Sequence, residues 1–287
     1  MSKLIELKRR IKSTKNIKQI TKAMEMVSIV KLRKAQDLLN HNREYYQIID
    51  NTMKIIETYK ENLEIKEEKN ILLAIVTPSK GMVGALNINI ENNVRKFLET
   101  KKDKKIKIVA IEKKALNFMF TLNKEILAHF MDIREPIQME DIYPISDLIE
   151  SQYTEEKVDS IYMIYPKFVN IMTNEIVTEK ILPIEIKDKD SIYYTKENDD
   201  DPQSIYDFVI PIDDIYNQAI RIYIGSKLYL AVAEEATSEH SSRMIAMRNA
   251  ADNATELNNE LIFASNKERQ TKITAEVLEI ASATNIT

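Results

Sequence analysis

The sequence predicts an α/β protein: a long antiparallel two-helix coiled coil formed by the N- and C-terminal helices, with a small Rossmann-like α/β domain inserted between them. Residues 1–58 contain neither glycine nor proline. After Pro211 there is no proline, and Gly225 is the only glycine. Between these ends, residues 70–200 alternate short β-branched runs with stretches of helical spacing, which is typical of a parallel sheet covered by helices.

The N-terminal segment predicts one continuous helix. Ile17, Ile20, Met24 and Val27 are separated by steps of 3, 4 and 3, the spacing of a coiled-coil seam. We therefore expect these four side chains to face a partner helix. A helix over this segment would be roughly 85 Å long, too long for one compact domain. The helical period continues further on at Leu38, Tyr45, Ile48, Ile49, Met53 and Ile56.

The C-terminal segment predicts a second long helix, from Asp213 to about Ala283, roughly 105 Å in length. Alanine is frequent on its apolar face, so two helix backbones can approach closely there. Neither helix is apolar enough on all sides to lie in a core, so we expect them to pair with each other. The alternative is two unrelated amphipathic helices packed on a globular body. The predicted face comprises Met244, Met247, Ala251, Ala254, Leu261, Ala264, Ile273, Val277 and Ile280.

The central segment predicts three strands, at NILLAIVTP (70–78), KIKIVAIE (105–112) and SIYMIYPKFV (160–169). ENNVRKFLETK and ISDLIESQY have helical spacing, IMTNEIVTEKILPI is expected to be extended, and KENDDDPQS (196–204) is expected to be a solvated acidic loop. The predicted parts are therefore an N-terminal shaft helix at 1–60, an α/β domain at 61–208 and a C-terminal shaft helix at 209–287.

The composition excludes several kinds of site. The chain has 287 residues, a formal net charge of −4, no cysteine and three histidines far apart in sequence, so we expect no disulfide, metal site or nucleic-acid partner. Its three glycines cannot form a glycine-rich phosphate loop, and no Ser-His-Asp arrangement is evident. We expect no cofactor and no catalytic residue. No apolar run approaches the ~18 residues that span a bilayer, so we expect a cytoplasmic protein, peripheral to a membrane at most.

Four stretches resemble the gamma subunit of F-type ATP synthases, in the order and at the spacing of that family. The two longer ones are ITKAMEMVSIVKLRKAQ (20–36) and SEHSSRMIAMRNAADNATELNNELIFASNKERQTKITAEVLEI (238–280); KGMVGALN (80–87) and PKFVN (166–170) are similar to its internal landmarks. The resemblance implies a non-catalytic central-stalk rotor, present in a single copy. Its implied partners are three alpha and three beta subunits of the catalytic head, an epsilon subunit, and a membrane proton-translocating c-ring or a substitute. The implied location is the inner face of the cell membrane.

The resemblance also implies contact residues. Residues 1–40 carry eleven Lys/Arg against three acidic residues, and in a gamma-like rotor these charges would face acidic loops of beta. A solvated basic face, core packing of Met24 and ordinary exposed polar positions are the alternatives. The implied rotor–stator contacts are Lys22, Met24, Lys80, Arg243, Arg269, Gln270 and Thr274. The resemblance also implies that the α/β domain is the foot of the rotor, with contacts to the ring or epsilon at Lys167, Phe168 and Asn170.

The sequence departs from the family pattern in two turns. Val83, Gly84 and Ala85 stand where the family commonly has Cys-Gly-Gly, and Glu112 and Ala115 stand at a turn that usually has two glycines. One alternative is therefore a gamma-like rotor of a specialised ATPase that drives a task other than proton transport. An alternative of another class is a structural coiled-coil scaffold, which should form a symmetric homodimer.

Overall fold

The computed structural model describes residues 3–59, 67–184 and 210–284. The chain divides into two compact units. The helical unit contains residues up to 30 and from 243 onward, and the sheet unit contains residues 31–242. The predicted domain limits near residues 60 and 208 and the predicted acidic loop at 196–204 lie outside the described residues.

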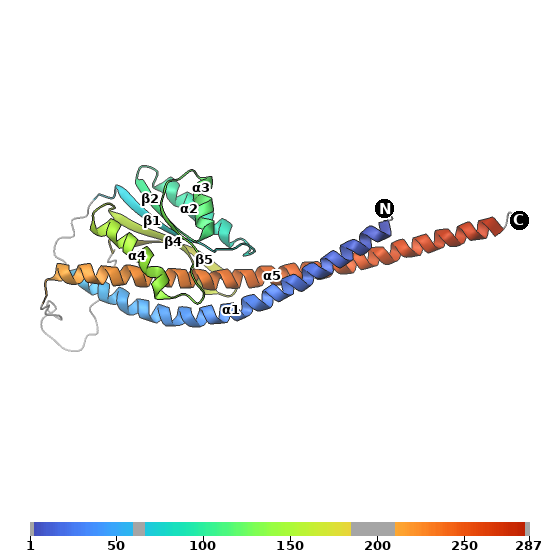
Figure 1. Cartoon of the computed structure of the whole chain (residues 1–287), viewed down its shortest axis with the longest axis horizontal. Helices are drawn as coiled ribbons and strands as arrows, with labels where there is room; N and C mark the ends of the chain where they lie inside the picture. Colours follow the sequence, from blue (N-terminus) through green and yellow to red (C-terminus); the bar gives the residue numbers. More distant parts are fainter. Residues whose placement is uncertain (1–2, 60–66, 185–209, 285–287) are drawn as a thin grey trace. The chain divides into compact units, whose positions relative to one another are not determined.

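Two long helices, α1 (Lys3–Tyr59) and α5 (Ile212–Thr284), contribute to both units (Figure 1). Within each unit the two helices run antiparallel: residues later in α1 contact residues earlier in α5. This confirms the predicted pairing of the two ends of the chain. The contacts are Lys3–Glu268 and Glu25–Arg248 in the helical unit, and Arg43–Glu234 and Tyr46–Tyr223 in the sheet unit.

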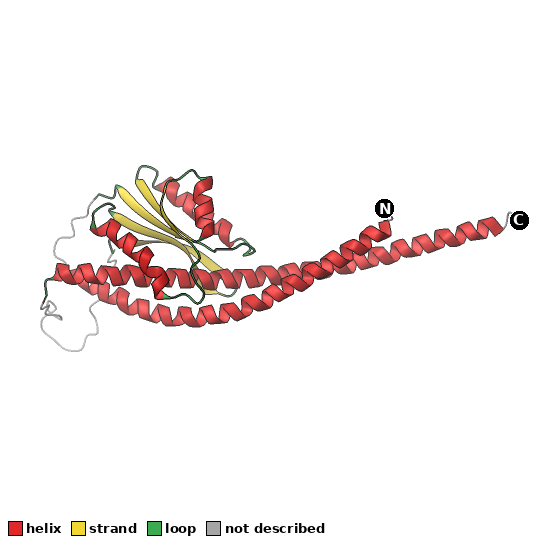
Figure 2. Ribbon diagram, viewed as in Figure 1, coloured by secondary structure: helices red, strands yellow, loops and turns green. Residues whose placement is uncertain are grey.

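The sheet unit contains one five-stranded sheet in the order β3-β2-β1-β4-β5 (Figure 2). All neighbouring strands are parallel except β4 and β5, which form an antiparallel pair. The strands are β1 (Asn70–Val76), β2 (Lys105–Ile111), β3 (Ile126–Phe130), β4 (Ser160–Asn170) and β5 (Thr173–Leu182). The helices that connect them are α2 (Leu86–Thr100), α3 (Lys113–Thr121) and α4 (Met139–Thr154).

The predicted strands and the two predicted central helices are present, but β3 and α3 were missed by the sequence analysis. The five residues of β3 form an edge strand that is only partly buried, so they lack the continuous apolar run that marks β1. The nine residues of α3 are a short helix that follows directly on β2. Short elements of this kind have too few residues to show a period.

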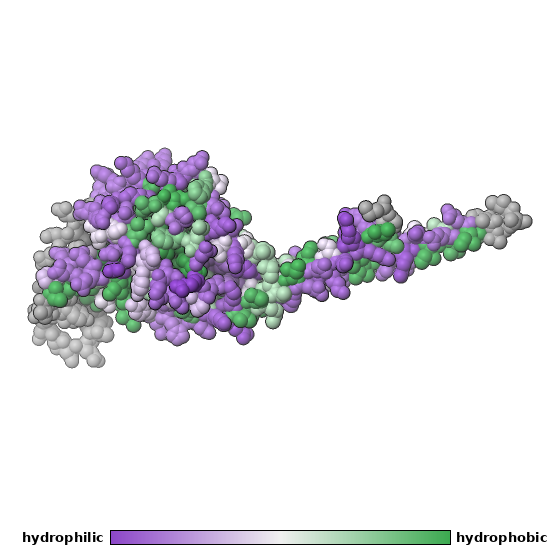
Figure 3. All heavy atoms as spheres, viewed as in Figure 1, coloured by the Kyte–Doolittle hydropathy of each residue, from purple (hydrophilic) through white to green (hydrophobic). Residues whose placement is uncertain are grey.

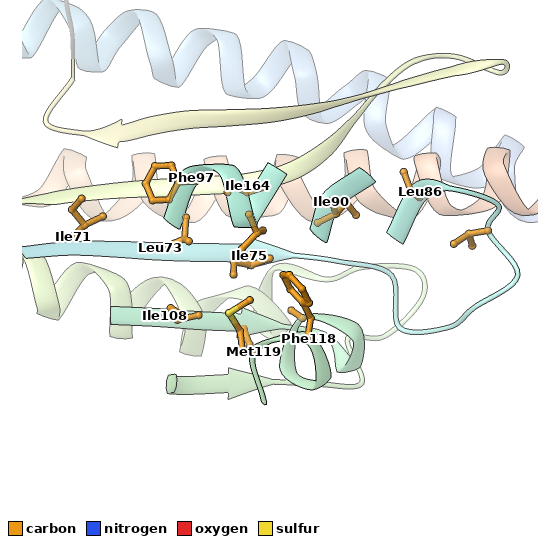
Figure 4. Packing of buried hydrophobic residues seen from close by; sticks show 14 residues of the cluster. Ile71, Leu73, Ile75, Leu86, Ile90, Phe97, Ile108, Phe118, Met119 and Ile164 are labelled. Atoms are coloured by element: carbon orange, nitrogen blue, oxygen red, sulfur yellow. The ribbon is translucent and has the colours of Figure 1, made fainter. Parts of the chain in front are cut away.

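Helices α2 and α3 cover one face of the sheet. Ile71, Leu73 and Ile75 of β1 point from alternate positions into the same cluster as Ile90 of α2 and Met119 of α3 (Figure 4). Alternate residues of a strand share one face, so the other residues of β1 face the opposite layer. That layer contains α4 and part of α5.

Helices α4 and α5 pack closely at Gly225. A Cβ atom at Gly225 would lie 3.6 Å from the methyl group of Met139 and 3.8 Å from the hydroxyl of Ser146. Nearby, Arg221 forms an ion pair of 3.0 Å with Asp147. These contacts fix α4, and with it the sheet, to the helix that ends the chain.

The predicted seam of α1 in the helical unit was wrong. Ile17, Ile20 and Val27 are 50%, 60% and 58% exposed, and Met24 is only half-buried. Further along α1, in the sheet unit, Tyr45 and Ile48 are exposed as well, whereas Met53 and Ile56 are buried as expected. The side chains of α1 that are buried in the helical unit are Thr14, Thr21, Glu25 and Ser28.

These four buried positions also have the spacing of a coiled-coil seam, but their side chains are small or polar; Glu25 lies four residues after Thr21 and three before Ser28. Thr14, Thr21 and Ser28 are separated by steps of seven, the period of a coiled-coil seam. Small residues let two helix backbones approach closely, so packing does not require the apolar stripe. An apolar stripe with a helical period therefore does not identify the surface that it packs against.

The predicted face of α5 was correct at its start only. Met244, Met247, Ala251 and Ala254 are buried, and Leu261 is half-buried. Ala264 is exposed because it turns away from the seam. Ile273, Val277 and Ile280 are exposed because they lie after Glu268, which contacts Lys3 at the beginning of the described part of α1.

The turn after β2 keeps a glycine-type backbone although it contains glutamate. Glu112 has a φ of 72°, in the left-handed region that glycine adopts at little cost. Its carboxylate accepts the backbone N–H of Ile133 at 3.0 Å. In the loop before α2, Gly84 has a φ of 59°, so this turn retains glycine where the backbone requires it.

Candidate functional site

The seam of the helical unit contains one buried carboxylate. Glu25 is 2% exposed, and both of its oxygens are hydrogen-bonded. Lys22 Nζ donates to Oε2 at 2.8 Å, and Arg248 Nε of the opposing helix donates to Oε1 at 3.1 Å. The hydrogen bond from Lys22 lowers the pKa of Glu25, with a smaller contribution from Arg248, against the opposing effect of burial. Only the carboxylate is buried, because the side chains of Lys22 and Arg248 are 60% and 55% exposed, and the bond to Arg248 aligns α1 with α5 at this position.

The outer surface of the helical unit combines apolar and basic side chains. Ile17, Ile20 and Val27 are exposed, and Lys18 and Lys22 are exposed among them. Figure 3 shows hydrophobic and hydrophilic atoms interleaved along these helices. A surface with apolar residues flanked by flexible cations can bind a partner that offers apolar contacts and acidic loops.

Three of the predicted contact residues share one exposed stretch of α5. Arg269, Gln270 and Thr274 are all exposed, and the hydroxyl of Thr274 donates to the backbone carbonyl of Gln270 at 2.9 Å. Gln270 and Thr274 border a shallow open hollow together with Leu278. The structure thus brings these residues together on one accessible surface.

The other predicted contact residues are divided between exposed and buried positions. Arg243 is only 9% exposed and Phe168 is buried, so neither presents its side chain at the surface. Lys80 is exposed in the loop before α2, and Lys167 is exposed on β4. Asn170 is also exposed, and its side-chain oxygen accepts the N–H of Met172.

Phe168 belongs to a buried joint that connects both long helices with β4. Arg43 Nε and Nη2 donate to the two carboxylate oxygens of Glu234 at 2.8 and 3.0 Å. Arg43 Nη2 also donates to the carbonyl of Phe168 at 2.6 Å, and the N–H of Phe168 donates to Glu234 at 2.8 Å. The Glu234 side chain is 3% exposed, so the two-pronged pair from Arg43 is what compensates its burial. We call these three residues the Arg43 joint.

A second polar joint surrounds Lys227 of α5. Lys227 is almost fully buried, its Nζ lies 2.8 Å from Glu179 of β5, and it lies 4.4 Å from the ring centre of Tyr46 on α1. The hydroxyl of Tyr165 on β4 donates to the same glutamate at 2.9 Å. Burial raises the pKa of Tyr46 and of Tyr165 well above the usual value, so both hydroxyls stay protonated.

A third joint connects the segment between β3 and α4 to both long helices. Glu135 contacts Lys31 of α1 and lies 3.3 Å from Nε2 of His240 on α5. The hydrogen bond from His240 is the main reason that the pKa of Glu135 falls to about 2, with Lys31 contributing less. Sequence reasoning missed all three joints. The local signal for the first two was a charged side chain, Glu234 or Lys227, within an otherwise apolar stretch of α5, and Glu135 lies in no helix and has no such signal.

The carboxyl ends of the parallel strands offer little room for a nucleotide. In open α/β sheets, nucleotides bind at this edge, where the strand order reverses. Here α5 contributes to the wall of a hollow of about 40 Å³, which is too small for a nucleotide. Carboxylates outnumber the one cation, Arg134, in this wall, so its net charge would repel phosphate groups.

The described residues contain no group of three or more His, Cys, Asp or Glu side chains placed to hold a metal ion. No helix within residues 3–59, 67–184 and 210–284 is both long and apolar enough to cross a membrane.

The comparisons with known proteins agree with one another. The family model described as ATP synthase matches residues 3–285. The ATP synthase gamma chains of Variovorax paradoxus and Roseiflexus sp. are 35% and 32% identical to this chain, and each alignment covers 96% of both sequences. A chain in the rotor of the Euglena gracilis mitochondrial ATP synthase has the same fold, with a TM-score of 0.64 at 16% identity, over 94% of this chain and 98% of that one. The chain therefore belongs to the ATP synthase gamma-chain family.

Proposed function

We propose that this chain is the central-stalk rotor of an F-type ATP synthase, a subunit that carries torque and has no catalytic residues of its own. The observation that carries the proposal is that the two ends of one chain pair as antiparallel helices in each unit. A single chain can thereby supply a two-helix axle. Two-helix axles resist bending better than one helix, because each helix restrains the other along its length.

The Arg43 joint supports the same function within the sheet unit. Torque can pass between the sheet and the helices only if the sheet does not slide along them. Arg43 and Glu234 connect α1 to α5, and both also bond the backbone of Phe168 on β4. Hydrogen bonds to charged groups are directional, so this arrangement opposes sliding more than apolar packing does.

The proposed partners are three alpha and three beta subunits around the helices, and an epsilon subunit and a c-ring at the sheet unit. Seven residues are proposed to contact the head: Lys22, Met24, Lys80, Arg243, Arg269, Gln270 and Thr274. Exposed cations steer a partner and contribute little affinity each, which suits a contact that must be made and broken in every turn. The proposed foot contacts are Lys167, Phe168 and Asn170. Phe168 is buried, so its proposed role is to hold the strand that presents the other two. The proposed location is the inner face of the cell membrane.

The mechanism proposed is mechanical. Each beta subunit meets a different side of the axle, so each has a different balance between its open and closed states. Rotation exchanges these sides in turn, and this couples rotation to ATP synthesis or hydrolysis in the head.

Reconstitution tests the proposal directly. The full-length chain is mixed with the alpha and beta subunits of the same organism, and ATP hydrolysis and rotation of a bead attached to the sheet unit are recorded. We expect one copy of the chain per complex and rotation in one direction driven by ATP. A complex with two copies of the chain, or hydrolysis without rotation, would contradict the proposed function.

The exposed apolar stripe of α1, which consists of Ile17, Ile20 and Val27, can be tested by comparing one exposed and one buried isoleucine. Ile20→Ser changes a side chain that is 60% exposed and contacts no core, whereas Ile90→Ser changes one buried in the sheet unit. We expect Ile20→Ser to leave folding intact and to weaken association with the head, about three- to tenfold. If Ile20→Ser assembles as tightly as the unchanged protein, this stripe does not face the head.

A further inference from the structure

A hollow within the sheet unit has the size and the wall of a small-molecule site. It measures about 320 Å³, which is within the size range of ligand pockets and roughly ten times the volume of one water molecule in the liquid. Both long helices and the segment between β3 and α4 surround it. Its apolar wall consists of Ala35 and Leu38 of α1, Ala233 and Ala236 of α5, and Pro136 and Ile137 of the connecting segment.

The polar groups around this hollow leave one positive charge without a counterion. Glu135 is occupied by Lys31 and His240, as described above. Lys34 also lines the hollow, and within the described part of the chain it forms no ion pair. Lys34 is exposed, so its amine can reach the border of the hollow from the solvent side and is the cation available there for one negative charge.

His240 supplies an independent indication. Its side chain is 4% exposed and lines the hollow, and its Nδ1 has no hydrogen-bond partner among the described residues. Buried polar atoms are nearly always paired, and an unpaired one in a native structure points to a water or a ligand. A group bound in the hollow would be next to this histidine.

We propose that this hollow binds a small organic monocarboxylate with a compact apolar body, roughly ten non-hydrogen atoms in size. The apolar body packs on the alanine-rich wall, and the carboxylate pairs with Lys34. Multiply charged anions such as nucleotides fit poorly, because the wall is apolar and Glu135 stands beside the cations. A bound ligand would contact α1, α5 and the connecting segment at once, and would thereby stabilise the joint made by Glu135.

The test uses the full-length chain and phenylacetate, with phenylacetamide as the uncharged match. Binding is measured by ligand-observed NMR and by the shift of the thermal midpoint. We expect phenylacetate to bind with a dissociation constant in the millimolar range or below, and phenylacetamide to bind at least fivefold more weakly. If phenylacetate does not bind at all, or if the amide binds equally well, the proposal is wrong.

Three variants locate the site. Ala236→Leu fills the hollow and should weaken phenylacetate binding about tenfold, and Lys34→Gln removes the free cation and should weaken it about fivefold. Lys18→Gln removes an exposed cation of the same helix that does not line the hollow, and should leave binding unchanged. Because Lys34 is exposed, its variant tests the site even if Ala236→Leu is unstable. Equal binding by the Lys34 and Lys18 variants would overturn the assignment.

Discussion

The same pair of helices is built differently in the two units. In the sheet unit, α1 buries large apolar side chains such as Leu32, Leu39 and Met53. In the helical unit, it buries Thr14, Thr21 and Ser28 and exposes isoleucine and valine. The first arrangement derives stability from contacts inside the chain, whereas the second leaves apolar surface exposed. The difference teaches that apolar residues of one helix stabilise the fold in one unit and lie at the surface in the other, where the contacts with the catalytic head are proposed.

Leu39→Ala should have the largest effect on stability. Leu39 is 1% exposed, and removal of a buried leucine side chain costs about 2–5 kcal/mol because a cavity remains. Ser28→Ala is the matched change in the helical unit; its hydroxyl bonds only the carbonyl of Met24 on the same helix, so we expect a loss below about 0.5 kcal/mol. Urea unfolding followed by circular dichroism measures both. Equal losses would remove the distinction between the units.

Arg43→Ala should have the second-largest effect on stability. We expect the free energy of unfolding to fall by about 3 kcal/mol, because the carboxylate of Glu234 stays buried without its cation. The matched change, Arg248→Ala, leaves Glu25 still bonded to Lys22, so we expect only about 1 kcal/mol. The same unfolding measurement compares them. If Arg248→Ala costs as much as Arg43→Ala, the bond from Lys22 does not compensate the buried carboxylate of Glu25, and the expected difference between the two units is wrong.

Glu135→Gln should have a smaller effect, and one that depends on pH. The pKa of Glu135 in the folded protein is about 2, below the usual value of 4.5. Its contribution to the free energy of unfolding is therefore present above pH 4.5 and is lost as the pH falls toward 2. The Glu135 side chain is 43% exposed, so we expect at most about 1 kcal/mol at neutral pH. The stability difference between the variant and the unchanged protein should shrink from pH 5 to pH 3 in thermal unfolding. A difference that grows over this range would show that Glu135 is not stabilised as a carboxylate.

The smallest effect on stability is expected for Ile17→Ser, below about 0.5 kcal/mol, since this side chain is half exposed. Thermal unfolding of the isolated chain measures it. A loss of more than 1 kcal/mol would mean that Ile17 packs within the chain, as the sequence pattern first indicated.

The sequence predicted the fold in outline because its signals are long. Two segments without proline, and three β-branched runs between them, are enough to predict the helix pair and the parallel strands. The sequence did not predict which face of α1 meets α5, because an apolar stripe that packs inside the chain and one that awaits a partner have the same period. Contacts such as Arg43 with Glu234, 191 residues apart, depend on the tertiary arrangement and leave no local pattern.

The two departures from the family pattern also have different structural outcomes. Glu112 stands at a turn where glycine is usual, yet it keeps the left-handed backbone and bonds Ile133 with its own side chain. Gly84 remains at the other turn that requires a positive φ. Both turns thus have a residue with positive φ, one glycine and one glutamate, so these departures do not by themselves indicate a different partner for the foot.

A carbodiimide crosslink between Lys3 and Glu268 tests the central claim that the two ends of one chain form the axle. Their side chains lie 3.0 Å apart, so the reagent can join them without a spacer. Chains with natural and with heavy isotopes are mixed, unfolded and refolded together, and the joined peptides are identified by mass spectrometry. We predict that both peptides of each crosslink carry the same isotope. Crosslinks that combine the two isotopes would show that each end pairs with a second copy, and the chain would then not be a single-copy rotor.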